Sequence, residues 1–337
     1  MTDDEASPSS LVHLTFGFMA THTVRAAAEL GVLDAFGDDA LGSGRLAERL
    51  GLPAATTVRL LRALAALGLL AETERDVFRP TATGRLLRAD HPNSMRSFVE
   101  MFGDPVMQRA WERLPDSVRT GRPAFDDVFG APFFPYLQGK PDKAELFNRT
   151  MSVVSDVVAA DLAGAFPFAE HQTLVDVGGG DGTTLATVLA AHPALHGIVF
   201  DSEAGAAQAA DVLAARGIDA RAKVATGDFF AAVPAGGDLY LLKNVLHDWD
   251  DEPAGRILRN CRAEIPSTGR LLIVEPTLLP DSPANDYLDD LNMMVNLGGR
   301  TRTRHEFEQV CTAAGFELTG AKPIAGGIAW LFEAWPA

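Results

Sequence analysis

The chain has 337 residues, 47% of them hydrophobic, which provides enough apolar material for packed cores and enough length for two domains. Its formal net charge of −16 argues against nucleic acid and anionic membrane surfaces as partners, because both repel an acidic protein. Cys261 and Cys311 lie far apart without a CxxC or Cys/His pattern, so the sequence indicates neither a disulfide framework nor a zinc site.

The N-terminal residues MTDDEASPSS are acidic and polar, and they lack the basic start and apolar core of a secretory signal. No apolar run in the sequence approaches the roughly 18 residues that a membrane-spanning helix needs. We therefore expect a cytoplasmic protein with no membrane partner.

The first elements predicted along the chain are helical. Apolar positions recur at helical spacing over residues 11–30, and Gly31 provides a stop, so one amphipathic helix is expected there. A helix over residues 45–52, a second over 53–70 and a pair of extended segments over 72–87 follow. That order is typical of a winged helix-turn-helix.

A winged helix has two interpretations, a DNA-binding module and a scaffold for dimerisation. Only Arg59 and Arg62 of the second helix could face a phosphate backbone, and the rest of that helix is mostly Leu and Ala, which favours the scaffold. The apolar stripe from Leu11 to Leu30 also exceeds what a small winged helix can cover. A homodimer held through the N-terminal helices is therefore predicted.

Residues 91–170 are predicted to form a helical bridging segment, with a Pro/Phe-rich turn at 130–142 and a long helix from Ala144 to Gly164. From Thr173 onward, short apolar runs alternate with Ala-rich helical stretches, which is the pattern of βαβ units. The predicted strands are TLVDV, GIVFD, ARAKVAT, DLYLLKN, RLLIVEP, FELTGAKPI and IAWLFEAW. The sequence thus predicts three parts, residues 1–90, 91–170 and 171–337, the last a doubly wound α/β domain.

A glycine cluster, DVGGGDG at 176–182, follows the first of these strands, where backbone amides can approach a nucleotide-like ligand. A dinucleotide fingerprint would need Gly or Ala three residues after Gly180, but Thr183 stands there, which disfavours NAD. The carboxylates of Asp176 and Asp181 would repel a pyrophosphate and would suit the ammonium of an amino-acid moiety. The expected ligand carries positive charge.

Two more aspartates follow the next strands. Asp201 ends the second strand at a spacing where a carboxylate accepts hydrogen bonds from ribose hydroxyls, and Asp228, beside Phe229, follows the third, where it could receive an adenine amino group. Each aspartate alone is equally typical of a helix cap. Together with the glycine loop they predict an adenosyl site.

The fourth strand leads into LKNVLHDWDDE, which projects His247 from the carboxyl end of the sheet, where open α/β folds bind and transform ligands. Glu275 ends the fifth strand and opens onto the same crevice, so it could orient His247 and favour the protonated imidazole. One histidine and scattered carboxylates do not make a metal-ligand cluster, so no metal dependence is expected.

These motifs occur in a fixed order, and GGRTRTRHEFEQVCTAAGF follows them. With them the chain resembles, over nearly its full length, the plant-type small-molecule O-methyltransferases and their bacterial natural-product relatives. The resemblance implies a doubly wound Rossmann-like methyltransferase domain and an N-terminal all-helical, winged-helix-like dimerisation domain. It also implies S-adenosylmethionine as cofactor, S-adenosylhomocysteine as product, and a small aromatic or polyketide-like acceptor.

The resemblance also implies roles for particular residues. Those that bind S-adenosylmethionine are Gly178, Asp201, Asp228, Phe229 and Lys243, which join Asp176 and Gly180 of the glycine loop. His247 falls on the general base and Glu275 on its partner acid. The residues that match the acceptor-lining positions are Phe147, Met151, Asn292, Met293 and Asn296. A Phe or Met at helical spacing is also common in a simple core.

Two positions depart from the family pattern. Thr301 stands where the plant members have a second Glu, in a GGKERT segment, so the His/Glu/Glu set is incomplete here. Ser202 replaces an apolar residue of FDLP that forms an adenine wall in the family.

Two alternatives remain open at this stage. The same scaffold could methylate nitrogen or carbon, or use bound S-adenosylmethionine in a hydroxylation or decarboxylation, and Thr301 keeps that option. An alternative of another class is a winged-helix transcriptional regulator that senses S-adenosylmethionine, which predicts salt-dependent DNA binding.

Overall fold

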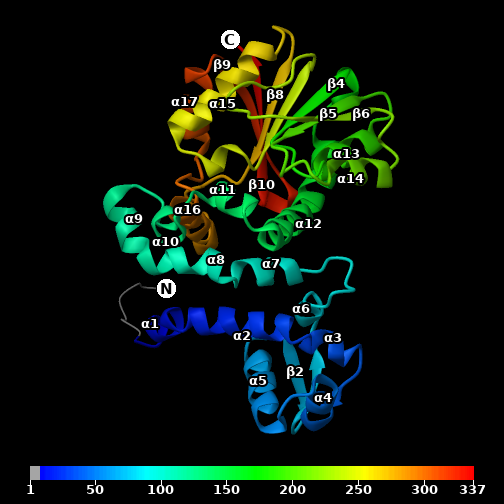
Figure 1. Ribbon diagram of the computed structural model, residues 1–337, viewed down its shortest axis with the longest axis vertical. Helices are drawn as coiled ribbons and strands as arrows, with labels where there is room; N and C mark the ends of the chain where they lie inside the picture. Colours follow the sequence, from blue (N-terminus) through cyan, green and yellow to red (C-terminus); the bar gives the residue numbers. More distant parts are fainter. Residues whose placement is uncertain (1–7) are drawn as a thin grey trace. The chain divides into compact units, whose positions relative to one another are not determined.

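The computed structural model describes residues 8–337 (Figure 1). The chain forms two compact units, one ending at Gln108 and the other beginning at Arg109. The three-part division expected from the sequence stays a prediction. We expect that the acidic N-terminus does not act as a secretory signal. Most of that segment, residues 1–7, lies outside the described residues.

The N-terminal unit is built mainly from helices. Its elements are α1 (Pro8–Thr15), α2 (Gly17–Glu29), α3 (Val32–Phe36), β1 (Leu41–Gly42), α4 (Ser43–Leu50), α5 (Ala54–Ala66), β2 (Leu70–Glu74), β3 (Val77–Pro80), α6 (Ala82–Arg85), α7 (Arg96–Phe102) and α8 (Pro105–Gln108).

The prediction of one continuous helix over residues 11–30 is wrong, because α1 and α2 are separated at Phe16. The Thr15 hydroxyl donates a hydrogen bond to the Leu11 carbonyl at 2.7 Å, a back-bond that bends helices, and the weak helix former Gly17 follows. The predicted stop is confirmed, since Gly31 adopts a φ of 65° just after α2.

The winged-helix prediction is confirmed. α4 and α5 are followed by the antiparallel strands β2 and β3, which β1 extends into a three-stranded sheet, so the unit is helical except at this wing. Its core contains Phe36, Leu46, Leu61 and Phe78, each at most 1% exposed.

The second unit begins with helices: η1 (Arg109–Arg113), α9 (Leu114–Thr120), α10 (Ala124–Phe129), α11 (Phe133–Gln138), α12 (Pro141–Ala165) and η2 (Phe168–Glu170). The long helix expected from Ala144 to Gly164 is confirmed as α12. The expected turn at 130–142 instead contains α11. Pro132 is the residue just before this helix, and its ring fixes φ at −58°, a value that is compatible with a helix start at Phe133.

All seven predicted strands are confirmed: β4 (Thr173–Val177), β5 (His196–Asp201), β6 (Ala222–Thr226), β7 (Leu239–Lys243), β8 (Arg270–Glu275), β9 (Phe316–Ile324) and β10 (Ala329–Pro336). They form one sheet in the order β6-β5-β4-β7-β8-β10-β9. β4 to β8 pair in parallel, and β10 runs antiparallel to both β8 and β9.

The remaining helices of this unit are α13 (Thr183–Ala191), α14 (Ala209–Ala215), η3 (Leu246–Asp248), α15 (Asp251–Glu264), α16 (Ala284–Asn296), α17 (Arg304–Ala313) and η4 (Ala325–Gly327). α12, α13 and α14 pack on one face of the sheet, and α15 and α17 on the other (Figure 1).

Both faces of the sheet are therefore buried, which makes the central strands read as unbroken apolar runs. In β7, Leu239 and Leu241 join one core while Tyr240 and Leu242 join the other. The doubly wound α/β prediction is confirmed, and the parallel strands bring their carboxyl ends to one edge. No helix within residues 8–337 has the length and hydropathy needed to cross a membrane.

Candidate active site

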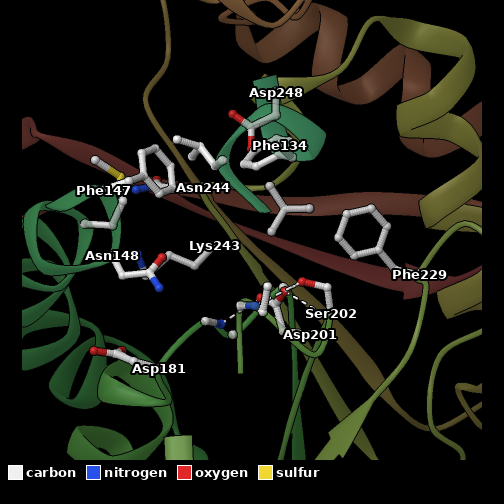
Figure 2. A pocket seen from close by; sticks show the side chains of 18 of the residues that line it. Phe134, Phe147, Asn148, Asp181, Asp201, Ser202, Phe229, Lys243, Asn244 and Asp248 are labelled. Atoms are coloured by element: carbon white, nitrogen blue, oxygen red, sulfur yellow. Dashed lines mark hydrogen bonds between the residues drawn. The ribbon is translucent and has the colours of Figure 1, made fainter. Parts of the chain in front are cut away.

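A cavity of about 570 Å³ opens at the carboxyl ends of the parallel strands. It is lined by the glycine loop after β4, the ends of β5 and β7, the η3 turn and one face of α11 and α12. Figure 2 shows Phe134, Phe147 and Asp248 on one side of this cavity and Asp181, Asp201 and Ser202 on the other. We call these two sides the aromatic end and the glycine-loop end.

The glycine loop can reach the cavity because its residues have no side chains at critical points. Gly178 has a φ of 73°, and a Cβ atom on it would lie 2.5 Å from Val245 Cγ2. Asp176, beneath the loop, is 1% exposed, and its Oδ2 has no hydrogen-bond partner among the described residues. Burial raises the pKa of this carboxyl to about 7, against the opposing effect of Lys243.

Asp201 is bonded back to the glycine loop. Its Oδ2 accepts from the Gly180 N–H at 2.9 Å, and its Oδ1 accepts from the Ser202 N–H at 2.6 Å. Burial raises the pKa of Asp201, although these hydrogen bonds oppose that rise. Ser202, one of the departures from the family pattern, lines the cavity beside it.

Asp228 and Phe229 line the same end of the cavity. Asp228 Oδ1 accepts from the Phe230 N–H at 2.8 Å, a local turn contact, and its other oxygen is not used in that bond. Phe229 packs edge-on against Trp249, with ring centroids 6.2 Å apart. An adenine-sized ring system therefore has apolar walls here.

Lys243 ends β7 inside the cavity, where its Nζ donates to Ser155 Oγ at 2.8 Å. Burial lowers the pKa of Lys243, while Asp176, Glu275 and Asp181 oppose that effect. The cavity lining, within residues 8–337, carries five aspartates and this one lysine. A ligand with positive charge suits that balance.

His247 lies in the η3 turn with a carboxylate against each ring nitrogen. Its Nδ1 is 3.1 Å from Glu275 Oε2, and its Nε2 is 3.3 Å from Asp248 Oδ1. Burial lowers the pKa of His247, but the two carboxylates outweigh burial and raise it well above the usual value. The predicted proximity of Glu275 to His247 is thus present.

The backbone of the turn that carries His247 is held on several sides. Glu275 is fully buried, and its Oε1 accepts from the N–H groups of Val245 and Leu246 at 2.9 and 2.7 Å. The His247 carbonyl accepts from the Arg300 N–H at 2.9 Å. Gly299 makes that approach possible, because a Cβ atom on it would lie 2.0 Å from the His247 carbonyl oxygen.

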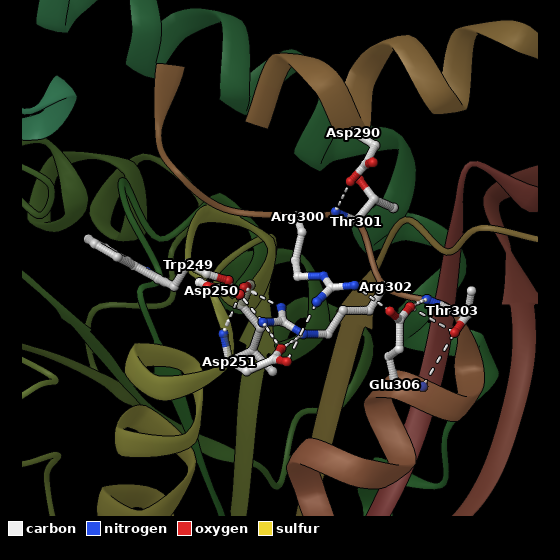
Figure 3. Close-up of polar contacts among 10 residues, drawn as sticks. Trp249, Asp250, Asp251, Asp290, Arg300, Thr301, Arg302, Thr303 and Glu306 are labelled. Carbon is white, nitrogen blue, oxygen red and sulfur yellow. Dashed lines mark hydrogen bonds and ion pairs between the residues drawn. The ribbon is translucent and has the colours of Figure 1, made fainter. Parts of the chain in front are cut away.

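Arg302 holds the same turn from the other side (Figure 3). Its fully buried guanidinium donates to the carbonyl groups of Leu246, at 2.7 Å, and Trp249, at 2.9 Å. It also pairs with Asp251 at 2.8 Å, which balances its charge. These contacts bracket His247 and Asp248 and fix their direction.

The five residues predicted to line the acceptor separate into two groups. Phe147 and Met151, on α12, line the cavity. Asn292, Met293 and Asn296, on α16, are buried and are not part of the cavity lining. The side-chain oxygen of Asn292 accepts from Trp111 Nε1 at 3.2 Å and from Asn296 Nδ2 at 2.8 Å, so this cluster ties α16 to η1.

Thr301 lies beside this turn. It is 3% exposed, its N–H donates to Asp290 Oδ1 at 2.8 Å, and its Oγ1 has no hydrogen-bond partner in the described part of the chain. It carries no charge where the family pattern has an acid, so Glu275 and Asp248 are the carboxylates in contact with His247.

Sequence reasoning missed several residues of this site. Ser152 and Ser155 of α12, whose partners are Asp181 and Lys243, are three residues apart, and Ser155 lies four residues after Met151, spacings that signal a shared helix face. Arg302 stands in GGRTRT without any pattern that marks it as buried. Phe134 was hidden in the segment expected to be a turn.

The second unit is an α/β methyltransferase domain by its strand order and by the place of its cavity. Residues 111–317 match the O-methyltransferase domain, and residues 12–90 match the O-methyltransferase dimerisation domain. The chain belongs to this O-methyltransferase family. It is a S-adenosylmethionine-dependent O-methyltransferase that acts on small-molecule natural products.

The chain is similar to individual members of that family. It is 42% identical to an O-demethylpuromycin-O-methyltransferase of Streptomyces alboniger over 94% of this chain and 85% of that protein. The crystal structure of LaPhzM matches with a TM-score of 0.90 and 37% identity over 98% and 99% of the two chains. NcsB1, from neocarzinostatin biosynthesis, matches with a TM-score of 0.81 and 32% identity over 94% and 96%, and was solved with S-adenosylmethionine and a naphthoic acid.

The contacts of Arg302 generate a first prediction. Replacing Arg302 by Met removes a donor from the carbonyl groups of Leu246 and Trp249, and the Leu246 carbonyl then keeps the 3.3 Å bond from the Trp249 N–H. Arg302→Lys can restore only part of that set. We expect turnover to fall about 10- to 100-fold, with little change in the affinity for S-adenosylmethionine, because the turn that carries His247 would be displaced while the glycine loop stays in place.

Arg300→Met is the matched control. Its side chain is 39% exposed and pairs with Glu306 and Asp251, so turnover should stay near wild type. Steady-state kinetics and calorimetry with folded protein measure both effects. An Arg302→Met variant as active as Arg300→Met would contradict the positioning role.

Proposed function

We propose that this enzyme methylates a phenolic hydroxyl of a small aromatic acceptor, with His247 as the general base and Glu275 as its partner acid. The observation that carries the proposal is the position of His247 on the cavity wall, with Glu275 and Asp248 against its two ring nitrogens. Titratable groups with strongly shifted pKa values in a cavity are frequent at catalytic centres.

The residues at the glycine-loop end fit S-adenosylmethionine. The orphaned oxygen of Asp176 and the surplus of carboxylates suit an ammonium and a sulfonium, and the bare backbone at Gly178 and Gly180 leaves room for close approach. In this proposal Asp201 binds the ribose, Asp228 and Phe229 bind the adenine, and Lys243 is a further residue of the cofactor site. S-adenosylmethionine supplies the methyl group as an electrophile on its sulfonium.

The chain's own residues then have two tasks, alignment and proton removal. Phe147 and Met151 hold the acceptor ring so that its hydroxyl faces the methyl group, and such alignment supplies much of the rate enhancement. His247 takes the hydroxyl proton as the new bond forms, and Glu275 stabilises the imidazolium.

The raised pKa of His247 has two opposing effects on this step. With ordinary values near 10 for a phenol and 6.5 for His, full proton transfer would cost about 5 kcal/mol, and a higher His247 pKa narrows that gap. The same rise leaves less of the neutral imidazole at pH 7. A positive charge in the cavity favours the neutral form and offsets this loss.

The remaining expectations complete the proposal. No group of three or more His, Cys, Asp or Glu side chains within the described residues is arranged to hold a metal ion, and we propose a metal-independent reaction. The match to the dimerisation domain and the exposed apolar residues of α1 and α2 support a homodimer, and we keep a cytoplasmic location as a proposal.

Asp201→Ala tests the assignment of the cofactor site. Loss of a charged hydrogen-bond partner should weaken S-adenosylmethionine binding by about 1.5–3 kcal/mol. Calorimetry measures the change, and Glu203→Ala, which removes an exposed carboxylate two residues away, is the control. Equal affinity in the two variants, with both folded, would assign the ribose contact to another residue.

His247→Ala and His247→Gln test the base. Both variants should bind S-adenosylmethionine normally and lose on the order of 10²–10⁴ in turnover, because neither side chain can take the proton. Higher pH should partly rescue both, since solvent then supplies the phenolate. If both retain more than about a tenth of wild-type turnover, alignment carries the reaction and His247 is not the base.

The shifted pKa of His247 predicts that S-adenosylmethionine and S-adenosylhomocysteine release different numbers of protons when they bind. The two ligands differ only in the methyl group and its positive charge. A group with a raised pKa holds its proton at pH 7, and a sulfonium nearby favours its release. Binding of S-adenosylmethionine at pH 7 should therefore release more protons than binding of S-adenosylhomocysteine. The effect of the ligand ammonium on Asp176 is common to both and cancels.

Calorimetric titrations in two buffers of different ionisation enthalpy count these protons. The His247→Gln variant should show no difference between the ligands. Turnover of the wild type should keep rising as the pH increases above the ordinary His pKa of about 6.5, as neutral His247 becomes more abundant. Equal proton release by the two ligands in the wild type would contradict this account.

A further inference from the structure

The aromatic end of the cavity combines apolar rings with negative charge. Phe134 and Phe147 line it together with the carboxylate of Asp248 (Figure 2), and Trp249, which also contacts Phe229, packs against Phe134. Phe134 packs against Trp249 at 6.0 Å and against Phe147 at 6.2 Å between ring centroids, so the rings form a continuous wall.

The nearby cations are already engaged. Lys243 is the one lysine or arginine that lines the cavity within residues 8–337, and its Nζ is bonded to Ser155 at the glycine-loop end. Arg300 pairs with Glu306 and Asp251, and Arg302 is fully buried against Asp251 and backbone carbonyl groups. Apart from His247, which already contacts Glu275 and Asp248, no cation in the described lining is therefore left to bind a carboxylate of an acceptor.

A second carboxylate, Asp289, lies close to the His247 turn. It is on α16, next to Asp290, whose Oδ1 accepts from the Thr301 N–H at 2.8 Å, and this bond ties the helix to the segment that packs on His247. Asp289 is half-buried, lies outside the cavity lining, and has no hydrogen bond or ion pair within the described residues.

The electrostatic surroundings of Asp289 agree with that placement. Burial raises the pKa of Asp289, and His247 is the charged group that most strongly opposes the rise, while Asp286, Asp290 and Asp248 reinforce it. Asp289 is thus an anion without a cationic partner other than the imidazolium, and that partner disappears when His247 becomes neutral to act as the base.

Aromatic faces together with carboxylates are the groups that bind an ammonium ion, through cation–π attraction and charge-assisted hydrogen bonds. We propose that the acceptor is a phenol that carries a protonated amino group, bound at the aromatic end with Asp248 as its direct counter-charge and with Asp289, outside the lining, adding to the negative potential there. The inference rests on the proposed phenol O-methylation and names the class of acceptor. Asp248 is the direct contact, and Asp289 acts on the charge of the acceptor through the electrostatic potential.

The binding of such an ammonium also suits the base. Asp248 contacts His247 Nε2 at 3.3 Å and loses its positive partner when the imidazole gives up its proton. The acceptor's ammonium then replaces that charge. A carboxylate on the acceptor would face two like charges instead.

Three acceptors of similar size and phenol acidity test the proposal: tyramine, para-propylphenol and para-hydroxyphenylpropionate. They differ mainly in the charge of the side chain. With the intact enzyme and labelled S-adenosylmethionine, kcat/KM should be highest for tyramine, about tenfold lower for the neutral phenol and about tenfold lower again for the acid.

Two variants locate the selectivity. Asp289→Asn should reduce the ratio of kcat/KM for tyramine to that for para-propylphenol by about three- to tenfold, and Asp289→Lys should bring the acid level with or above tyramine. Asp281→Asn removes an exposed carboxylate ahead of α16 and should leave the ratio unchanged. Cofactor affinity and thermal melting confirm that each variant is folded.

The outcomes separate this inference from the proposed function. Methylation of all three compounds at similar rates, or a preference for the acid, would overturn the inference and leave phenol methylation standing. If no phenol is methylated, the proposed function fails, and binding of the three compounds to the enzyme with S-adenosylhomocysteine decides the inference. Tyramine binding that is no tighter than that of the other two would then overturn it.

Discussion

The whole site depends on how the short helical turn from Val245 to Trp249 is held beyond the end of β7. Asn244, just before it, has a φ of 53°, a conformation that few residues other than glycine adopt. Buried peptide groups in such a turn need partners. Glu275 accepts hydrogen bonds from two backbone N–H groups of the turn, and Arg302 donates hydrogen bonds to two of its carbonyl oxygens. Because these bonds are made, His247 lies beyond the end of β7 and lines the cavity.

Glu275 therefore serves two purposes with its two oxygens. One oxygen holds the backbone of the turn, and the other faces the imidazole. Because the carboxylate is fully buried and its strand, β8, is central, its position is set by the core of the sheet. The imidazole is thus aligned by a carboxylate fixed in the buried sheet, and in the proposed mechanism this contact compensates for Thr301, which stands where the family pattern has a second acid.

The sequence was sufficient for the sheet because each strand is a short apolar run buried on both faces, and glycine or aspartate marks its end. The sequence was also sufficient to predict the strand-end residues around the cavity, because the glycine or aspartate at the end of each strand marks them. It was not sufficient where packing overrides local pattern. Nothing local distinguishes Asn292, which bonds to Trp111, from a residue that faces the cavity. The burial of Arg302 likewise depends on carbonyl groups more than fifty residues away in the chain.

α12 contributes residues to both sides of the cavity, which affects how new substrate specificities can arise in this fold. Phe147 and Met151 line the cavity, and one turn on the same helix contacts Asp181 and Lys243 through Ser152 and Ser155. A shift of the helix that moves Phe147 and Met151 therefore also moves the contacts to Asp181 and Lys243, so in the proposed function the acceptor and donor sides change together. Changes of acceptor are less constrained on α11, which lines the cavity without holding Asp181 or Lys243, so directed evolution of new substrates should find most of its tolerated substitutions there.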